Sequence, residues 1–320
     1  MFLYSTFDFK VAVFALRLLF STMIRTFEEL KKKAKKKGRR ELVIACAEDK
    51  TALEASLHAA HEELVSPIFV GNKEKILAIA KAHALDVDQN SIENVDNRTD
   101  AVSVSIEIVR SHKGSFLLKG MVKTSAFLKG VLNPQTGLCT GRRLSHSAML
   151  QVPGYHKLIQ LTDGGMNIRP DIQTKIDIIK NAQSFALSLG IEQPKIALLS
   201  AIEVVNPDMP ETVDAAIIKQ MAERGQLGEI LIDGPLALDL AVSKEACAIK
   251  GVQSDIAGDA DILIVPDIAA GNIAAKALIY LGNALAAGII LGAQSPVVML
   301  SRADDTETKL NSIALGVLSC

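Results

Sequence analysis

The sequence predicts an α/β protein with a mostly parallel sheet. Short apolar runs alternate with longer segments of helical periodicity along most of the 320 residues, which is typical of strands joined by crossover helices. The run 262–265 is apolar at every position, as parallel strands buried on both faces are. Hydrophobic residues make up 49% and charged residues 22% of the chain, a balance typical of a protein with a substantial core.

This pattern assigns the individual elements. Strands are expected at 42–45, 67–70, 115–118, 148–152, 158–161, 195–199, 229–232, 261–265 and 296–300. Helices are expected at 72–84, 171–189, 211–224, 272–281 and 304–318. The segment 171–189 shows the helical periodicity well, because its Ile and Phe residues fall near one helical face.

The chain is expected to fold as two α/β domains. Pro153 and Gly154 interrupt the pattern and predict a hinge, and a second crossing is expected near 292–296. The first domain would comprise residues 23–151 and 297–320, and the second residues 152–296. The last helix would then return to the first domain.

Residues 1–22 stand outside this pattern. Their apolar run, 11–20, is interrupted by Arg17 and is far shorter than the ~20 apolar residues that span a bilayer. Asp8 lies upstream, and no small-residue cleavage site follows. We expect a non-native or disordered extension ahead of a natural start at Met23.

Charge and cysteine usage indicate a cytoplasmic protein without a metal site. The formal charge is −1, so no global field favours nucleic acid or an anionic membrane. The four cysteines lack paired spacing and fit reduced thiols in a cytosol. His58 and His61 could share a metal ion, but no third ligand is evident, and no metal site is expected. Fingerprints for a dinucleotide, a P-loop and a nucleophile elbow are absent from the sequence.

A basic run at 31–40 holds eight Lys or Arg in ten positions. One interpretation is an anionic partner such as nucleic acid. The other is a solvated helix that docks through Phe27, Leu30 and Ala34. No aromatic residues interleave the basic ones, which favours the second interpretation.

The segment 296–305 is the most informative motif. An apolar strand ends in Ser301 and Arg302, and the acidic residues Asp304 and Asp305 follow. Ligands gather at the carboxyl ends of strands in open α/β sheets, and a hydroxyl beside a guanidinium suits an oxyanion or a phosphate. The alternative is an aspartate that caps the next helix, with Arg302 in a surface ion pair.

Two turns could approach a ligand through their backbone. In 266–272, Gly271 and Asn272 precede a helix that carries Lys276, and a helix N-terminus attracts anions. In 162–167, a Gly-rich turn ending at Asn167 could offer N–H groups. Ordinary turns without a ligand remain the alternative for both.

A further segment has phosphate-binding chemistry. Lys123 and Thr124 open a helix after a strand, and Arg142 and Arg143 follow downstream. Hydroxyls and cations at a helix start bind phosphate, although surface basic residues would look the same.

Together these motifs resemble the phosphate acetyltransferases and phosphate butyryltransferases. The likeness covers roughly residues 25–320 and is closest to the butyryltransferase branch through TGRRLSH, TDGGMNI and SRADD. It is carried by VKTSAFLKGVLNPQTGLCTGRRLSHSAMLQVPGYHKLIQLTDGGMNI, DGPLALDLA, ADILIVPDIAAGNIAAKALIYL and PVVMLSRADDTETKLNSIALG.

The resemblance implies an enzyme that transfers a short acyl group reversibly between coenzyme A and inorganic phosphate. It implies a fold similar to the isocitrate and isopropylmalate dehydrogenases, with a cleft between two domains. Coenzyme A would be a substrate, no cofactor would be bound, and the chain would form a homodimer or larger assembly. The alternatives are a phosphate acetyltransferase acting on acetyl-CoA, a dehydrogenase of the same fold, and a nucleic-acid-binding protein.

The resemblance also assigns roles to residues. Ser301 and Arg302 would polarise the acyl carbonyl and hold the phosphate. Phosphate contacts would fall on Arg142 or Arg143 with Lys123 and Thr124 nearby, and the cleft loop on Gly271, Asn272 and Lys276.

Two positions depart from the family pattern. The acetyltransferases carry an aspartate as proposed thiol base where this chain has Thr308, which leaves Asp304 and Asp305 as candidates. Cys139 stands where an arginine is expected.

Overall fold

The computed structural model describes residues 24–299 and 304–320. Its strands are β1 (Arg40–Ala45), β2 (Val65–Gly71), β3 (Ile92–Asn94), β4 (Phe116–Lys119), β5 (Ser145–Gln151), β6 (Ile159–Thr162), β7 (Lys195–Leu199), β8 (Leu231–Leu236), β9 (Ile262–Ile264), β10 (Leu285–Leu291) and β11 (Val297–Val298). Its helices are α2 (Phe27–Lys37), α3 (Lys50–His61), α4 (Lys73–Ala82), α5 (Arg98–Ser111), α6 (Thr124–Val131), α7 (Ile172–Ser188), α8 (Pro210–Glu223), α9 (Leu238–Val242), α10 (Lys244–Lys250), α11 (Ile268–Tyr280) and α12 (Thr306–Ser319).

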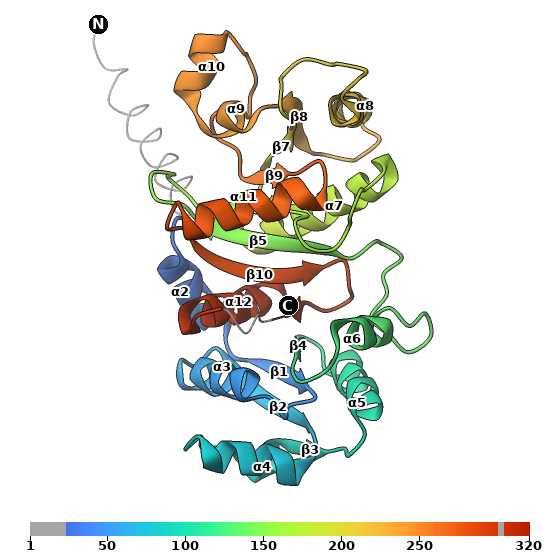
Figure 1. Cartoon of the computed structure of the whole chain (residues 1–320), viewed down its shortest axis with the longest axis vertical. Helices are drawn as coiled ribbons and strands as arrows, with labels where there is room; N and C mark the ends of the chain where they lie inside the picture. Colours follow the sequence, from blue (N-terminus) through green and yellow to red (C-terminus); the bar gives the residue numbers. More distant parts are fainter. Residues whose placement is uncertain (1–23, 300–303) are drawn as a thin grey trace, which may run out of the picture.

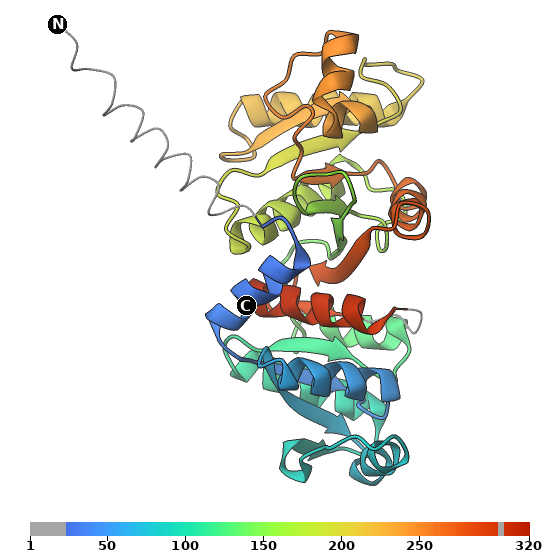
Figure 2. The ribbon, with the colours of Figure 1, turned by 90° about the vertical axis from the view of Figure 1, so that its left-hand side faces the viewer.

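The strands form one 11-stranded sheet in the order β3-β2-β1-β4-β11-β10-β5-β6-β9-β7-β8. The pairs from β3 to β11 are parallel, as are those from β6 to β8. Between these two halves, β10 pairs antiparallel with β11 and β5, and β5 pairs antiparallel with β6. Figures 1 and 2 show the two halves above and below the long strands β5 and β10. The predicted α/β class with a mostly parallel sheet is therefore confirmed.

The position of the domain boundary stays a prediction. The expected boundaries fall beside β5 and β10, and these two strands pair with each other from Ser145 to Gln151 and from Leu285 to Leu291. The paired strands join the halves into a continuous sheet.

The structure corrects some of the expected elements. The strands β3 and β10 were not predicted, and α11 begins at Ile268 rather than near residue 272. The early start follows from Asp267, whose side chain accepts a hydrogen bond from the backbone N–H of Ala270 and so caps the helix. Gly271 and Asn272 consequently lie inside the first turn of α11 and not in a loop before it.

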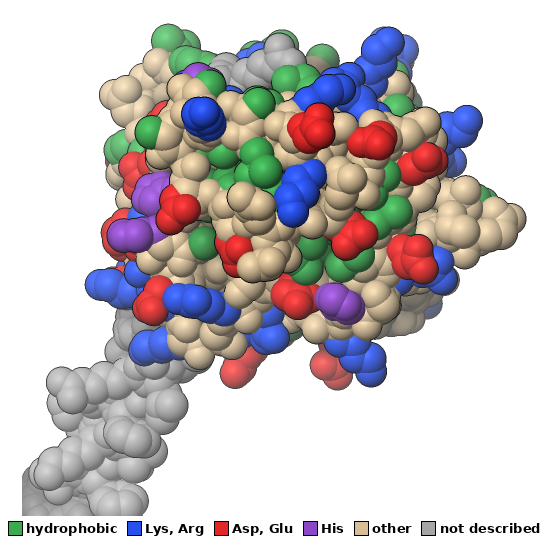
Figure 3. Space-filling model, turned by 90° about the horizontal axis from the view of Figure 1, so that it is seen from below, with side chains coloured by type: hydrophobic (Ala, Val, Ile, Leu, Met, Phe, Trp, Pro, Cys, Tyr) green, Lys and Arg blue, Asp and Glu red, His purple; other side chains and the backbone are tan. Residues whose placement is uncertain are grey.

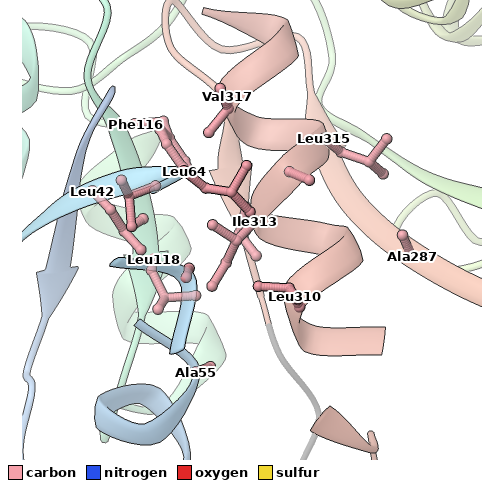
Figure 4. Close-up of a cluster of buried hydrophobic side chains, with 14 of the residues drawn as sticks. Leu42, Ala55, Leu64, Phe116, Leu118, Ala287, Leu310, Ile313, Leu315 and Val317 are labelled. Carbon is pink, nitrogen blue, oxygen red and sulfur yellow. The ribbon is translucent and has the colours of Figure 1, made fainter. Parts of the chain in front are cut away.

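The last helix, α12, is buried along most of its length and connects β10 with the first half of the sheet. Its residues 310–318 are all buried. Figure 4 shows Ile313 and Val317 among side chains of β1 and β4, with Leu315 on the side of Ala287 in β10. At Gly316, a Cβ would lie 2.3 Å from Phe116 Cε2, so a larger residue would push the helix off the sheet. The assignment of this helix to a first domain stays a prediction, like the domain boundary itself.

The basic run belongs to α2 and is held mostly by contacts within the chain. Phe27, Leu30 and Ala34 are buried, which confirms the docked-helix interpretation. Lys33 Nζ donates to the backbone oxygen of Leu189 at 2.6 Å, and Lys37 Nζ donates to that of Leu318 at 2.7 Å. Figure 3 shows acidic and basic side chains interspersed over the end of the molecule that carries α4, without a patch of one sign.

Three further features concern the described residues as a whole: the cysteines, membrane-spanning helices and metal ligands. All four cysteines are free thiols. None of the described helices is long and apolar enough to cross a membrane. The described residues contain no group of three or more His, Cys, Asp or Glu side chains that could hold a metal ion.

Candidate active site

Three segments that are distant in the sequence meet at His146 on β5. The imidazole packs between two glycines: a Cβ on Gly165 would lie 2.9 Å from the ring Cγ, and a Cβ on Gly288 would lie 3.2 Å from Nε2. Gly165 belongs to the turn after β6, and Gly288 lies in β10. These positions lack side chains because the ring occupies the space. Sequence reasoning quoted His146 in TGRRLSH without giving it a role.

The surroundings of His146 keep its imidazole uncharged. Burial lowers its pKa below the usual value, and the negative charges of Asp163 and Asp304 partly offset this effect. The ring nitrogen Nδ1 is buried and has no hydrogen-bond partner among the described residues. An imidazole whose pKa is lowered by burial is a candidate for proton transfer or for hydrogen bonding to a substrate.

The turn after β6 is organised by Asp163. Its Oδ1 accepts hydrogen bonds from the backbone N–H groups of Gly165 and Met166, both at 2.9 Å, and its Oδ2 accepts from that of Asn167 at 3.1 Å. The side-chain amide of Asn167 donates to Asp163 Oδ2 at 2.6 Å and to the backbone oxygen of Leu144 at 2.8 Å. The N–H groups that the sequence offered to a ligand are therefore occupied internally, and a binding role for Asn167 stays a prediction.

The turn after β6 and the start of α11 touch each other through glycines. A Cβ on Gly271 would lie 2.7 Å from Gly164 Cα, and Asn272 Nδ2 donates to the backbone oxygen of Gly164 at 3.3 Å. The structure thus brings Gly271, Asn272 and Asn167 into one region, and a ligand-binding role for them stays a prediction. Lys276 lies one turn further along α11 and is exposed.

The two acidic candidates for the thiol base differ in their surroundings. Asp305 caps α12, because its Oδ1 accepts from the backbone N–H of Thr308 at 2.7 Å, and this bond lowers the pKa of Asp305. Asp304 interacts electrostatically with His146. The capping alternative therefore applies to Asp305, whereas the charge of Asp304 acts on His146. Ser301 and Arg302 lie outside the described residues.

A basic groove lies at the carboxyl ends of β1 and β4. Arg98 and Lys123 line two cavities of about 270 and 530 Å³, so the cavities adjoin. Lys119 lines the smaller cavity and Lys129 the larger one. Lys123 is the residue that precedes α6, with Thr124 as its first residue. Sequence reasoning missed Arg98, Lys119 and Lys129, although Lys119 directly follows a predicted strand.

Arg142 and Arg143, which the sequence groups with Lys123, do not line the basic groove. Arg142 lines a separate cavity with residues of α7. The backbone N–H of Arg143 donates to Asp177 Oδ2 at 3.1 Å. The segment between α6 and β5 carries both arginines toward α7, which the order of motifs did not reveal. Cys139 is half-buried, and its sulfur lies 3.9 Å from the backbone oxygen of Val131. A thiol at this position does not supply the positive charge of the expected arginine.

Known structures share this fold. A branched-chain phosphotransacylase from Enterococcus faecalis superposes with a TM-score of 0.76 at 34% identity, covering 88% of this chain and 98% of that one. A 4-hydroxythreonine-4-phosphate dehydrogenase from Burkholderia phymatum has a TM-score of 0.53 at 14% identity, covering 88% of this chain and 98% of that one. The second likeness is one of fold alone, and it agrees with the expected dehydrogenase-like architecture.

Sequence relatives define the family. The family model described as phosphate acetyl/butaryl transferase matches residues 94–317. A phosphate butyryltransferase from Clostridium acetobutylicum is 42% identical over 296 residues, which are 92% of this chain and 98% of that protein. A phosphate acetyltransferase from Thermotoga maritima is 40% identical over 91% of this chain and 98% of that protein. The chain belongs to the phosphate acetyl/butyryl transferase family, as the motifs predicted.

Proposed function

We propose that this chain transfers a short acyl group reversibly between coenzyme A and inorganic phosphate, with butyryl or a similar chain preferred over acetyl. The observation that supports this proposal most strongly is the 42% identity to a phosphate butyryltransferase over 98% of that protein. The basic groove and the carboxylates around His146 supply the kinds of group that this reaction needs. No resident cofactor enters the proposal, because coenzyme A is a substrate.

The chemistry is a direct acyl transfer. In the direction of acyl-CoA synthesis, the thiol gives its proton to a carboxylate, since a free thiol has a pKa of about 8.5 and the thiolate is the nucleophile. The sulfur attacks the acyl carbonyl, the C–S bond forms, and the C–O bond to phosphate breaks. We assign the base to Asp304 because its neighbour Asp305 is engaged as a helix cap, and because the charge of Asp304 acts on the buried His146.

Ser301 and Arg302 complete the proposed site. The hydroxyl and the guanidinium would donate hydrogen bonds to the carbonyl oxygen as negative charge develops, and Arg302 would also hold the phosphate. This assignment rests on the sequence motif alone, because Ser301 and Arg302 lie outside the described residues.

The basic groove is the proposed binding region for the phosphates of coenzyme A. Arg98, Lys123 and Lys129 place three cations along cavities that also contain Thr99 and Ser103. The start of α6 adds free backbone N–H groups beside Lys123. Cations and a helix N-terminus are the groups that bind phosphate esters in proteins. Lys119, at the end of β4, continues the groove toward the sheet.

A second copy of this chain is the proposed partner of the outer face of α11. Ile273 is 69% exposed, Tyr280 is 70% exposed and Leu281 is 84% exposed, and Lys276 is the charged residue of this helix. An exposed apolar helix face marks an interaction surface. Light scattering should report a dimer or larger species for the wild type and a smaller one for Ile273→Lys. A cytoplasmic location is part of the proposal, and the four free thiols support it, because thiols stay reduced in a cytosol.

Thiol release from a series of acyl-CoA substrates tests the proposed function. With phosphate present, kcat/KM for butyryl-CoA or isobutyryl-CoA should exceed that for acetyl-CoA. A higher value for acetyl-CoA would make the chain a phosphate acetyltransferase. An absence of thiol release with every acyl chain from two to five carbons would refute the proposal.

A further inference from the structure

His146 and Gly288 form a partly exposed place on an otherwise buried face of the β5–β10 pair. In the register of these strands, His146 lies opposite Ile290, and Gly288 lies opposite Ala148. Residues two apart in a strand share a face, so all four are on the same side of the sheet. His146 and Gly288 are partly exposed, whereas their neighbours on this face are buried: Ala148, Leu150, Ala286 and Ile290. The sheet is therefore open at these two positions, between its two halves.

The two ring nitrogens of His146 have different surroundings. Nδ1 is buried and has no hydrogen-bond partner among the described residues. Nε2 lies toward Gly288, because a Cβ on that glycine would stand 3.2 Å from it. Among the described residues outside the adjoining strand positions, only ring atoms of His146 would lie within 4 Å of this Cβ. The space over Gly288, on the Nε2 side of the ring, is thus not filled by a described side chain.

These surroundings assign the imidazole proton to Nε2. Burial lowers the pKa of His146, so the ring is neutral and carries one proton on one of its nitrogens. A proton on Nδ1 would be a buried N–H donor without an acceptor, which is rare in folded proteins. The carboxylate of Asp163 does not accept it, because its oxygens bind the N–H groups of the turn after β6. The proton therefore belongs on Nε2, on the partly exposed side of the ring.

The helix that follows the Ser301–Arg302 motif is attached at the same place. Ser312 Oγ in α12 accepts a hydrogen bond from the backbone N–H of Gly288 at 2.9 Å. The charge of Asp304, two residues before α12 begins, acts on His146. The start of α12 and the proposed thiol base therefore belong to the region around the Nε2 donor.

A neutral N–H donor suits an oxygen that becomes negative only during the reaction. In the proposed acyl transfer, the acyl carbonyl oxygen gains negative charge as the thiolate attacks, and preorganised donors stabilise this charge. A neutral imidazole can polarise a carbonyl in this way. A resident anion such as phosphate would be matched better by an imidazolium, which burial disfavours. The acyl carbonyl is therefore the group that fits the Nε2 donor.

We propose that Nε2 of His146 donates a hydrogen bond to the acyl carbonyl oxygen, which makes His146 a catalytic residue in addition to Ser301 and Arg302. This assignment rests on the proposed acyl transfer. No covalent bond to His146 forms or breaks, and the proton stays on Nε2 throughout. Gly288 leaves free the space that the carbonyl group enters beside the ring.

Thiol release from butyryl-CoA in the presence of phosphate tests the assignment. His146→Phe keeps a flat ring without a donor and should lower kcat about 10²-fold, the usual effect of losing one such donor. The KM values should change little, because the interaction strengthens in the transition state. His146→Gln keeps a side-chain N–H donor and should recover at least about tenfold of the loss. His83→Phe, at an exposed position, is the control and should keep the wild-type kcat.

Two kinetic outcomes would overturn the assignment. A wild-type kcat in His146→Phe would show that the ring does not act on the substrate. Equal losses in His146→Phe and His146→Gln would show that the ring serves packing alone.

Gly288→Ala tests the space beside the ring while it keeps the imidazole. The added methyl group would stand 3.2 Å from Nε2 and occupy the place assigned to the carbonyl. We expect kcat to fall at least about tenfold, with a thermal melt close to that of the wild type. An unchanged kcat would contradict the assignment, because the substrate would then not use this space.

Nitrogen NMR tests the tautomer without any catalytic activity. The chain contains six histidines, and the signals lost in His146→Phe identify His146. At a pH of about 8, above the usual imidazole pKa, we expect the proton on Nε2, and a proton on Nδ1 would overturn the assignment even in an active enzyme. No thiol release by the wild type would refute the proposed function itself, whereas normal release with an unaffected His146→Phe variant would refute only the role of His146.

Discussion

Gly271 in the first turn of α11 lies directly against Gly164 in the turn after β6. A Cβ on Gly271 would stand 2.7 Å from Gly164 Cα and 2.7 Å from Val265 Cγ2. Real Cβ atoms do not come so close to backbone, so glycine is needed here for space. The contact fixes α11 against the turn that Asp163 organises, and thus positions the region beside His146.

Replacing Gly271 with alanine should destabilise the protein despite a better helix propensity. Alanine is favoured over glycine inside a helix by about 1 kcal/mol. The clash with Gly164 should outweigh this gain and leave a net loss of about 1–3 kcal/mol, the usual cost of overpacking. Urea unfolding would measure it. A variant more stable than the wild type would show that the two segments can separate freely.

His146 should make stability depend on pH on the acid side of neutrality. The folded protein holds the imidazole uncharged, because burial lowers its pKa, whereas the unfolded chain protonates it near pH 6.5. Below that pH the unfolded state binds a proton that the folded state does not, so the free energy of unfolding falls as pH decreases. His146→Gln should flatten this dependence below about pH 6.5.

Urea unfolding at several pH values would compare the two proteins. His83→Gln, at an exposed position on the C-terminal end of α4, is the matched control and should keep the wild-type slope. If His146→Gln also keeps that slope, His146 is protonated to the same degree in the folded and unfolded states.

Much of the fold could be predicted because its strands and helices differ in period and length. The strands β1, β7 and β9 contain compact apolar runs, and α7 has an apolar stripe over 17 residues. β10 was missed although Gly282 and Asn283 precede it and Gly292 follows it. Its sequence, LAAGIIL, shows no alternation that would distinguish it from the apolar α11 just before it. Long-range pairing with β5 makes it a strand, and pairing partners are not visible in a single segment.

Sequence motifs that follow strands pointed to residues that the structure brings together. Asn167, Gly271 and Asn272 gather in one region, and their binding role stays a prediction. The sequence around His146 did not indicate a functional role, because a single histidine within a strand looks like any half-buried residue. Only the structure shows that Gly165 and Gly288 pack against its ring. Arg98 lies far from the other basic residues in sequence, and the parallel pairing of β1 and β4 brings its helix beside Lys123.

Removing cations from the basic groove should weaken coenzyme A binding rather than slow the chemistry. We expect Lys123→Ala to raise KM for coenzyme A about tenfold, because a charge-assisted hydrogen bond contributes ~1.5–3 kcal/mol. The turnover number should change little, and the loss should shrink at high salt. Lys81→Ala, on the exposed side of α4, serves as the control. Equal KM values for the two variants would remove the groove from the binding site.

Arg302→Lys should abolish most of the activity although it keeps the positive charge. Lysine offers a point charge where a planar, bidentate fork is proposed to hold the phosphate. We expect turnover to fall about 10²-fold or more, the usual scale for losing a preorganised donor. Ser301→Ala should lower turnover less, because a neutral donor contributes less than a charged one. Steady-state kinetics in both directions would measure these losses, and a thermal melt should be almost unchanged. Near-wild-type turnover, or a collapsed melting temperature, would contradict the assignment.

The most direct test is release of free coenzyme A from butyryl-CoA by the purified chain, with and without inorganic phosphate. No metal ion and no nucleotide would be added. The account predicts thiol release that requires phosphate, rises to saturation with phosphate concentration and yields butyryl phosphate in equal amount. Thiol release that is independent of phosphate would indicate hydrolysis, and no release at all would leave the chain without the proposed activity; either result would contradict the account.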